Sequence, residues 1–171
     1  MVRTRKIAAA VLTALALVIV VNHLTADGRA RVVVLGFNSR QLNDVQDRLL
    51  RETVLREFFD RGRAIVPVME IESLLLGDQR RNIRLLSEKD IREISVEIDA
   101  AYAICGTLEP ESGPADRCID AEARFVCHLV LYRRDDDTFV RERIVVNGAD
   151  TLDRFFSALA KEIVKRASKQ M

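Results

Sequence analysis

The sequence predicts an α/β fold: a mixed sheet with a C-terminal antiparallel meander, flanked by helices and preceded by one N-terminal transmembrane or signal helix. Three observations support this prediction. An uncharged apolar run follows a basic N-terminus, strand-like and helix-like hydrophobic patterns alternate through the first half, and three alternating strands precede a last amphipathic helix. Mixed strand and helix patterns of this kind predict one sheet packed against helices.

The N-terminal segment has the composition of an export element. Arg3, Arg5 and Lys6 precede the uncharged run 7–21. Extended to Leu24, the run gives about 27 Å of helix at 1.5 Å per residue, against a hydrocarbon core of about 30 Å. A signal-anchor and a cleaved signal peptide both fit these dimensions. Bulky Leu24 stands where a cleavage site prefers a small residue, which favours the uncleaved anchor.

We therefore expect two parts. Residues 1–26 form the signal-anchor or signal peptide, and residues 27–171 form a periplasmic α/β domain. The basic end stays in the cytoplasm by the positive-inside rule. The expected location is the bacterial inner membrane, crossed once by residues 7–24, with the domain in the periplasm, or secreted to the periplasm if the segment is cleaved. No cysteine stands near the end of the apolar run, which disfavours a lipoprotein anchor.

The first half predicts one buried strand and a long helix. The β-branched run Arg31–Phe37 indicates a strand buried on both faces. A helix follows, with Asn38 or Ser39 as its N-cap and Gly62 at its end. Its apolar residues recur at spacings of three and four and predict one packed stripe: Leu42, Val45, Leu49, Leu50, Val54, Phe58 and Phe59.

Two shorter elements are expected next. A short strand at 64–66 stops at Pro67, because proline has no N–H to donate to a sheet, and a short helix follows it. After a polar loop, Ser87 and Asp90 resemble a capping box that opens the helix EKDIREISVEI.

The second half predicts the meander. From residue 102 to residue 108 the side chains alternate, with Tyr102, Ile104, Gly106 and Leu108 on one face and Ala103, Cys105 and Thr107 on the other. Further strands are expected at 121–132, where Cys127 and His128 point to opposite faces, and at 139–146. Asp150 or Thr151 caps a last helix, whose apolar face is Leu152, Phe155, Phe156, Leu159, Ile163 and Val164.

Composition excludes several function classes. The 27 basic and 26 acidic residues are spread along the chain, so no nucleic-acid partner is expected. Metal-binding spacings of cysteine or histidine are absent, and the single glycine of VVVLGFNS falls short of a dinucleotide fingerprint, so we predict neither metal nor cofactor. The loop GDQRRNIR carries Arg80, Arg81 and Arg84, which are a candidate partner-contact loop, although such a loop is usually only solvated.

The three cysteines suggest a disulfide in an oxidising compartment. If their strands are antiparallel neighbours, Cys105 and Cys127 are the expected pair, with Cys118 and Cys127 as the competing pair and buried thiols as the third reading. A thiol enzyme would need a base beside a thiolate. His128 beside Cys105 is the arrangement that would supply one.

The stretches RVVVLGFNS, RAIVPVMEIESLL, LSEKDIREIS and IDAAYAICGTL together resemble a group of bacterial envelope domains. The group includes the curli secretion-channel lipoprotein, the lipoprotein activator of penicillin-binding proteins and the N-terminal domain of the Tol-Pal propeller protein. The most specific piece is Asp99-Ala100 followed by an apolar strand holding Gly106, which is similar to the family's G-A-D-Y-V-V-x-G run. The resemblance covers residues 31–165, and the chain lacks the lipobox cysteine of the lipoproteins.

This resemblance implies an envelope scaffold that binds protein partners. We predict a non-enzymatic, membrane-tethered periplasmic interaction module for envelope proteins, acting in cell-envelope assembly, secretion or cell-wall machinery. Assembly into a homo-oligomer follows only from the secretion-channel relative. The alternative is a small-ligand sensor or a thiol-dependent envelope enzyme with a pocket near Cys105 and His128.

Overall fold

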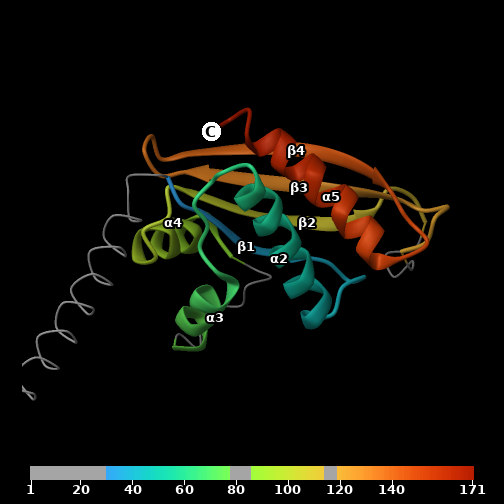
Figure 1. Cartoon of the computed structure of the whole chain (residues 1–171), viewed down its shortest axis with the longest axis horizontal. Coiled ribbons are helices and arrows are strands. Elements are labelled where there is room, and N and C mark those ends of the chain that lie inside the picture. The colour runs from blue at the N-terminus through green and yellow to red at the C-terminus, as the bar shows by residue number, and fades with distance from the viewer. Residues whose placement is uncertain (1–29, 78–85, 114–118) are drawn as a thin grey trace, which may run out of the picture.

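A computed structural model describes residues 30–77, 86–113 and 119–171. Its elements follow one another as β1 (Val32–Asn38), α2 (Asp44–Asp60), α3 (Val68–Gly77), α4 (Glu88–Glu97), β2 (Tyr102–Pro110), β3 (Arg124–Arg133), β4 (Thr138–Asn147) and α5 (Leu152–Ala167). The strands form one sheet in the order β1-β2-β3-β4 (Figure 1). β1 is parallel to β2, whereas β2, β3 and β4 are antiparallel neighbours, which confirms the mixed sheet and the meander.

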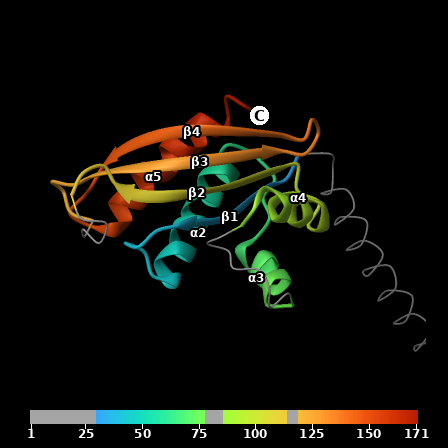
Figure 2. The same cartoon turned by 180° about the vertical axis from the view of Figure 1, so that it is seen from behind.

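Helices lie on both sides of the sheet. α2 and α5 pack against one face over the larger core cluster, and α3 and α4 cover one end of the other face over a smaller cluster (Figures 1 and 2). The predicted N-terminal helix lies outside the described residues. Within the described ranges, no helix is both long enough and apolar enough to cross a membrane.

β1 is buried on both faces, as its sequence predicts, and it carries a β-bulge. Val34 pairs with Ile104 and Gly36 with Cys105, so Leu35 is the extra residue. Before the bulge Val34 faces the α2 side, and after it Phe37 does so again. Leu35 packs with the α3 and α4 cluster.

The expected strand at 64–66 is reduced to one bridge. Ile65 pairs with Val32, and the backbone N–H of Val66 donates to the Val32 carbonyl at 2.9 Å. Pro67 follows and has no N–H, so the pairing ends there and α3 begins.

The helix ends follow the capping rules, but the α2 cap lies later than expected. Asn43 caps α2, and Gln46 completes a capping box. Asn38 and Ser39 do not cap the helix, because β1 continues through Asn38 and the Ser39 hydroxyl accepts from the backbone N–H of Gln41. The expected Ser87–Asp90 box of α4 is confirmed, and Thr151 caps α5.

α2 carries two apolar stripes where the sequence predicted one. Leu50, Val54, Leu55 and Phe58 are buried against the sheet. The other apolar residues of the helix face solvent, with exposed fractions of 67% for Val45, 46% for Leu49 and 64% for Phe59.

A buried ion-pair network fixes α2 to its neighbours. Asp47 Oδ1 accepts from the backbone N–H of Phe37 at 2.8 Å, just after the bulge. Its Oδ2 lies 3.1 Å from Arg51 Nε, and Arg51 Nη2 lies 3.1 Å from Glu72 of α3. Asp47 and Arg51 are both almost fully buried.

β4 forms an edge of the sheet. It pairs with β3 along its whole length, and no described strand pairs with its other side. The middle of this strand is charged, with Arg141, Glu142 and Arg143 in sequence. Arg141 and Arg143 lie on the face that carries α4, and Glu142 lies on the α5 side, where Gln170 donates to it at 3.4 Å.

Candidate functional site: a groove on the open face of the sheet

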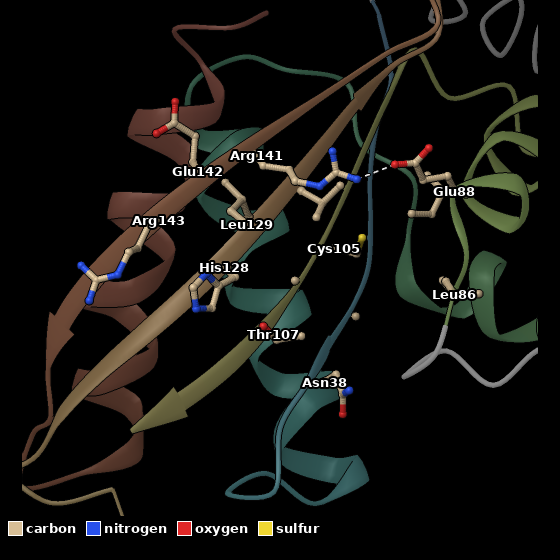
Figure 3. A pocket seen from close by; sticks show the side chains of 14 residues that line it. Asn38, Leu86, Glu88, Cys105, Thr107, His128, Leu129, Arg141, Glu142 and Arg143 are labelled. Carbon is tan, nitrogen blue, oxygen red and sulfur yellow. Dashed lines mark hydrogen bonds and ion pairs between the residues drawn. The ribbon is translucent and has the colours of Figure 1, made fainter. Parts of the chain in front are cut away.

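A groove of about 470 Å³ lies on the sheet face that α4 leaves partly open. All four strands contribute to its floor, and the start of α4 forms one wall. Its polar lining residues include Asn38, Thr107, His128, Arg141, Arg143 and Glu88 (Figure 3).

Strand register places these residues in two rows. One row runs Asn38, Thr107, His128 and Arg143 across the four strands, since each is the pairing partner of the next. The adjacent row runs Gly36, Cys105, Val130 and Arg141. Directly paired residues lie on the same face of a sheet, so the residues of both rows line the groove. In Figure 3 Cys105 and Thr107 follow one another along β2 beside His128 of β3.

Cys105 and His128 both line the groove, on one face of the sheet. The sequence predicts a pocket near these two residues under the alternative function, a small-ligand sensor or a thiol enzyme. Burial raises the pKa of the Cys105 thiol to about 12, so the thiol is protonated at neutral pH. His128 Nε2 lies 3.1 Å from Glu109 Oε1, and both side chains are at least half exposed. A thiol that burial keeps protonated at neutral pH is not an activated nucleophile.

The cations of the groove are held in ion pairs. Arg141 reaches from β4 to Glu88 of α4 (dashed line in Figure 3). Arg143 Nη2 lies 3.1 Å from Glu111, which also pairs with Arg124 at 3.0 Å. Since each cation faces a carboxylate, the groove offers polar contacts to a partner without a strong net charge.

The structure does not support the predicted pairing of Cys105 with Cys127. β2 and β3 are antiparallel neighbours as expected, and both cysteines are free thiols. Cys105 pairs with Val130 and Cys127 with Leu108, so alternation points the two sulfurs to opposite faces of the sheet. Cys127 is buried under α2 and α5, whereas Cys105 looks into the groove. The competing pairing involves Cys118, which lies outside the described residues.

Two further predictions concerned the polar loop and metal binding. Arg80, Arg81 and Arg84 lie outside the described residues, and their role as a contact loop stays a prediction. In the part of the chain that the structure describes, no cluster of three or more histidine, cysteine or acidic residues is arranged to hold a metal.

Sequence reasoning missed most of the groove. The β1 bulge and the registers of two strand pairs align Asn38, Arg141 and Arg143 with the groove. No local sequence motif predicts that alignment. The alternation of arginine on β4 was the available signal, since residues two apart on a strand share a face.

A second hollow of about 470 Å³ lies between α2 and the beginning of α3. Its lining is largely apolar and includes Leu55, Phe59, Ile65, Val68 and Met69. Phe59 and Met69 are 64% and 70% exposed at its rim. This surface is more hydrophobic than the groove, which carries more polar side chains.

No family model matches the sequence, and no curated protein is significantly similar to it. Solved structures do share its fold. The LpoB C-terminal domain from Salmonella enterica is 16% identical with a TM-score of 0.51, covering 75% of this chain and 92% of that chain. PelC from Paraburkholderia phytofirmans, solved as a dodecamer, is 12% identical with a TM-score of 0.50, covering 80% and 86%. Lipoprotein GNA1162 from Neisseria meningitidis is 10% identical with a TM-score of 0.54, covering 82% and 99%. These likenesses confirm, as a likeness of fold, the resemblance to bacterial envelope domains.

Proposed function

We propose that this chain is a membrane-tethered periplasmic module that binds another envelope protein through its groove and catalyses no reaction. Residues 1–26 serve as the anchor, with the membrane crossed by residues 7–24, and residues 27–171 form the periplasmic domain. The process served is envelope assembly, secretion or cell-wall machinery. The fold shared with the LpoB C-terminal domain and with lipoprotein GNA1162 supports an envelope role.

The observation that carries the proposal is an open groove without reactive chemistry. Its thiol is protonated at neutral pH, and its arginines are paired with carboxylates. Exposed Thr107 and half-exposed Asn38 offer hydrogen bonds that a protein surface can use. Such a surface suits recognition of a polar patch better than catalysis.

A photoreactive amino acid in place of Thr107 tests this proposal. In cells of the native host, we expect irradiation to join the full chain to one second protein. The matched control carries the same amino acid in place of Lys161, which is exposed on α5 at the opposite face. Equal adducts from both positions, or none from Thr107, would contradict groove-mediated protein binding.

A small-ligand sensor is the second candidate, because Cys105, Thr107 and His128 line one hollow. It predicts no protein adduct at Thr107. It predicts instead that small molecules raise the melting temperature of the full chain, and that Thr107→Trp abolishes the effect by filling the groove.

A further inference from the structure

α2 presents a solvent-facing stripe that a globular domain ordinarily buries. Val45, Leu49, Glu52, Arg56 and Phe59 follow one another at spacings of three and four, so they lie along one side of the helix. Val45, Leu49 and Phe59 are 67%, 46% and 64% exposed. Large apolar side chains exposed together along one side of a helix, here with Glu52 and Arg56 between them, are typical of an interaction site.

The stripe continues into the apolar hollow beside it. Met69, at the beginning of α3, is 70% exposed and lines the hollow together with Phe59. Among the described residues, four of the five large exposed hydrophobic side chains therefore lie on α2 or next to its end, and Val96 of α4 is the fifth. Figure 1 shows α2 outside the sheet, next to α5, where another molecule can reach it.

The charges along the stripe indicate what covers it. Arg48 and Glu52 flank Leu49, and Arg56 and Asp60 flank Phe59. Consider a second α2 lying antiparallel to the first, with Leu49 opposite Phe59 of the second copy. The same register places Glu52 opposite Arg56, and Arg48 opposite Asp60. Two-fold symmetry makes each of these contacts twice.

We propose that this stripe is where a second copy of the chain docks, with the two α2 helices antiparallel and Leu49 against Phe59. Neighbouring registers are worse. Sliding the helices one turn toward their N-termini places Arg48 opposite Arg56 and Glu52 opposite itself, which is repulsive. The charges thus select one register, and the apolar residues supply its contact surface.

The proposal goes beyond groove binding, because it uses a different surface. The groove lies on the sheet face that carries α4, and the stripe lies on α2 over the other face. A paired copy therefore leaves both grooves open to a partner.

Cross-linking between copies tests the docking. Two tagged versions of the full chain, one with Leu49→Cys and one with Phe59→Cys, are produced together in the same membranes and mildly oxidised. We expect a disulfide-linked species that carries both tags. The unsubstituted chain controls for the native cysteines, and Val96→Cys in both copies controls for random collision, because Val96 is equally exposed outside the stripe.

Charge exchange then tests the register. Glu52→Arg in both copies turns two attractive pairs into repulsive ones, and Arg56→Glu in both copies does the same. We expect each change to slow adduct formation about tenfold, equivalent to about 1.4 kcal/mol. Glu52→Arg in one copy with Arg56→Glu in the other restores both pairs, and we expect the rate to return. That restoration shows that the single variants are folded.

Three results would overturn the proposal. In the first, the Leu49→Cys and Phe59→Cys chains form adducts no faster than the Val96→Cys control. In the second, the single charge reversals do not change the rate of adduct formation. In the third, Phe59→Cys is joined to a different protein and not to a second copy of the chain. The Thr107 experiment detects a second kind of protein, whereas this one detects only copies, so the failure of one proposal is distinguishable from the failure of the other.

Discussion

Asp99 stands where the resembled family run begins with glycine. It follows α4 with a φ of 50°, in the left-handed region. Aspartate tolerates this region better than most side chains, and here its carboxylate pairs with Arg134 at 2.8 Å. The other glycine of the run is kept as Gly106. A Cβ there would lie 2.6 Å from the His128 carbonyl oxygen, so the close neighbour is the β3 backbone.

The two described thiols make the stability of the fold sensitive to alkali. Burial raises the pKa of Cys105 and of Cys127 to about 12. The folded state therefore keeps protons that the unfolded state loses above about pH 8.5. The two protonated thiols make their full contribution to the free energy of unfolding below about pH 8.5. That contribution is lost as the pH rises toward 12.

We expect the melting temperature of the full chain to fall between pH 9 and pH 12, and to fall less steeply in Cys105→Ala. Circular dichroism of the chain in detergent measures both. At pH 8, alkylation of Cys105 should be about a thousandfold slower in the folded chain than in urea, because the thiolate fraction falls tenfold per pKa unit. Rapid alkylation of Cys105 at neutral pH would revive the thiol-enzyme hypothesis.

At the scale of elements, the sequence predicted best what local chemistry determines. The α4 capping box, the Thr151 cap and the alternation of β2 and β3 are short-range patterns, and the structure contains them. The α2 cap was predicted too early, because both Asn38-Ser39 and Asn43 are polar enough to cap a helix. Asn38 pairs with Thr107 as part of β1, so the helix begins later, after Asn43.

Long-range geometry limited the rest. The spacing of Val45, Leu49 and Phe59 is helical, but only packing shows that they lie on the solvent side of α2. The groove likewise needed the register of four strands. Cys105 and His128 could be named as candidates from the sequence, whereas Arg141 and Glu88 are brought together over a separation of 53 residues.

The Asp47 network gives a prediction for how α2 is held. Asp47→Ala removes the acceptor of the Phe37 N–H and the more buried of the two carboxylate partners of the Arg51 guanidinium. We expect a loss of about 3–5 kcal/mol of unfolding free energy, as for a broken buried ion pair. Lys89→Ala, which removes an exposed pair with Glu93 at 3.7 Å, should cost less than about 0.5 kcal/mol. Urea unfolding of the full chain in detergent compares the two, and equal losses would contradict the structural role of the network.

For the whole molecule, both described ends of the chain meet at the start of β2. The Ala101 N–H donates to the Arg31 carbonyl at 2.9 Å, and the Tyr102 hydroxyl donates to the Met171 carbonyl at 3.1 Å. From Leu24 to Arg31 the chain reaches at most about 25 Å. A membrane-spanning segment ending at Leu24 would hold this end of the sheet near the bilayer and leave the Asn38 and Thr107 end of the groove farther away.

This arrangement predicts the behaviour of fusions at Met171. We expect alkaline phosphatase fused there to be active in bacterial cells and green fluorescent protein exported by the same route to be dark, because the proposed function places the domain in the periplasm. The chain should also keep residues 1–26, which intact mass measures. Deletion of residues 7–24 is the control and should reverse both reporters. A fluorescent fusion of the full chain would contradict the predicted topology.

The charged centre of β4 has a consequence for contacts between copies. An unpaired edge strand can pair with the same strand of another copy and form a continuous intermolecular sheet. Antiparallel pairing of two β4 strands must match residues of the same face. The two registers with the greatest overlap then set Arg141 against Arg143, or Arg143 against itself. Both are repulsive, so we expect this edge to disfavour an intermolecular sheet between β4 strands.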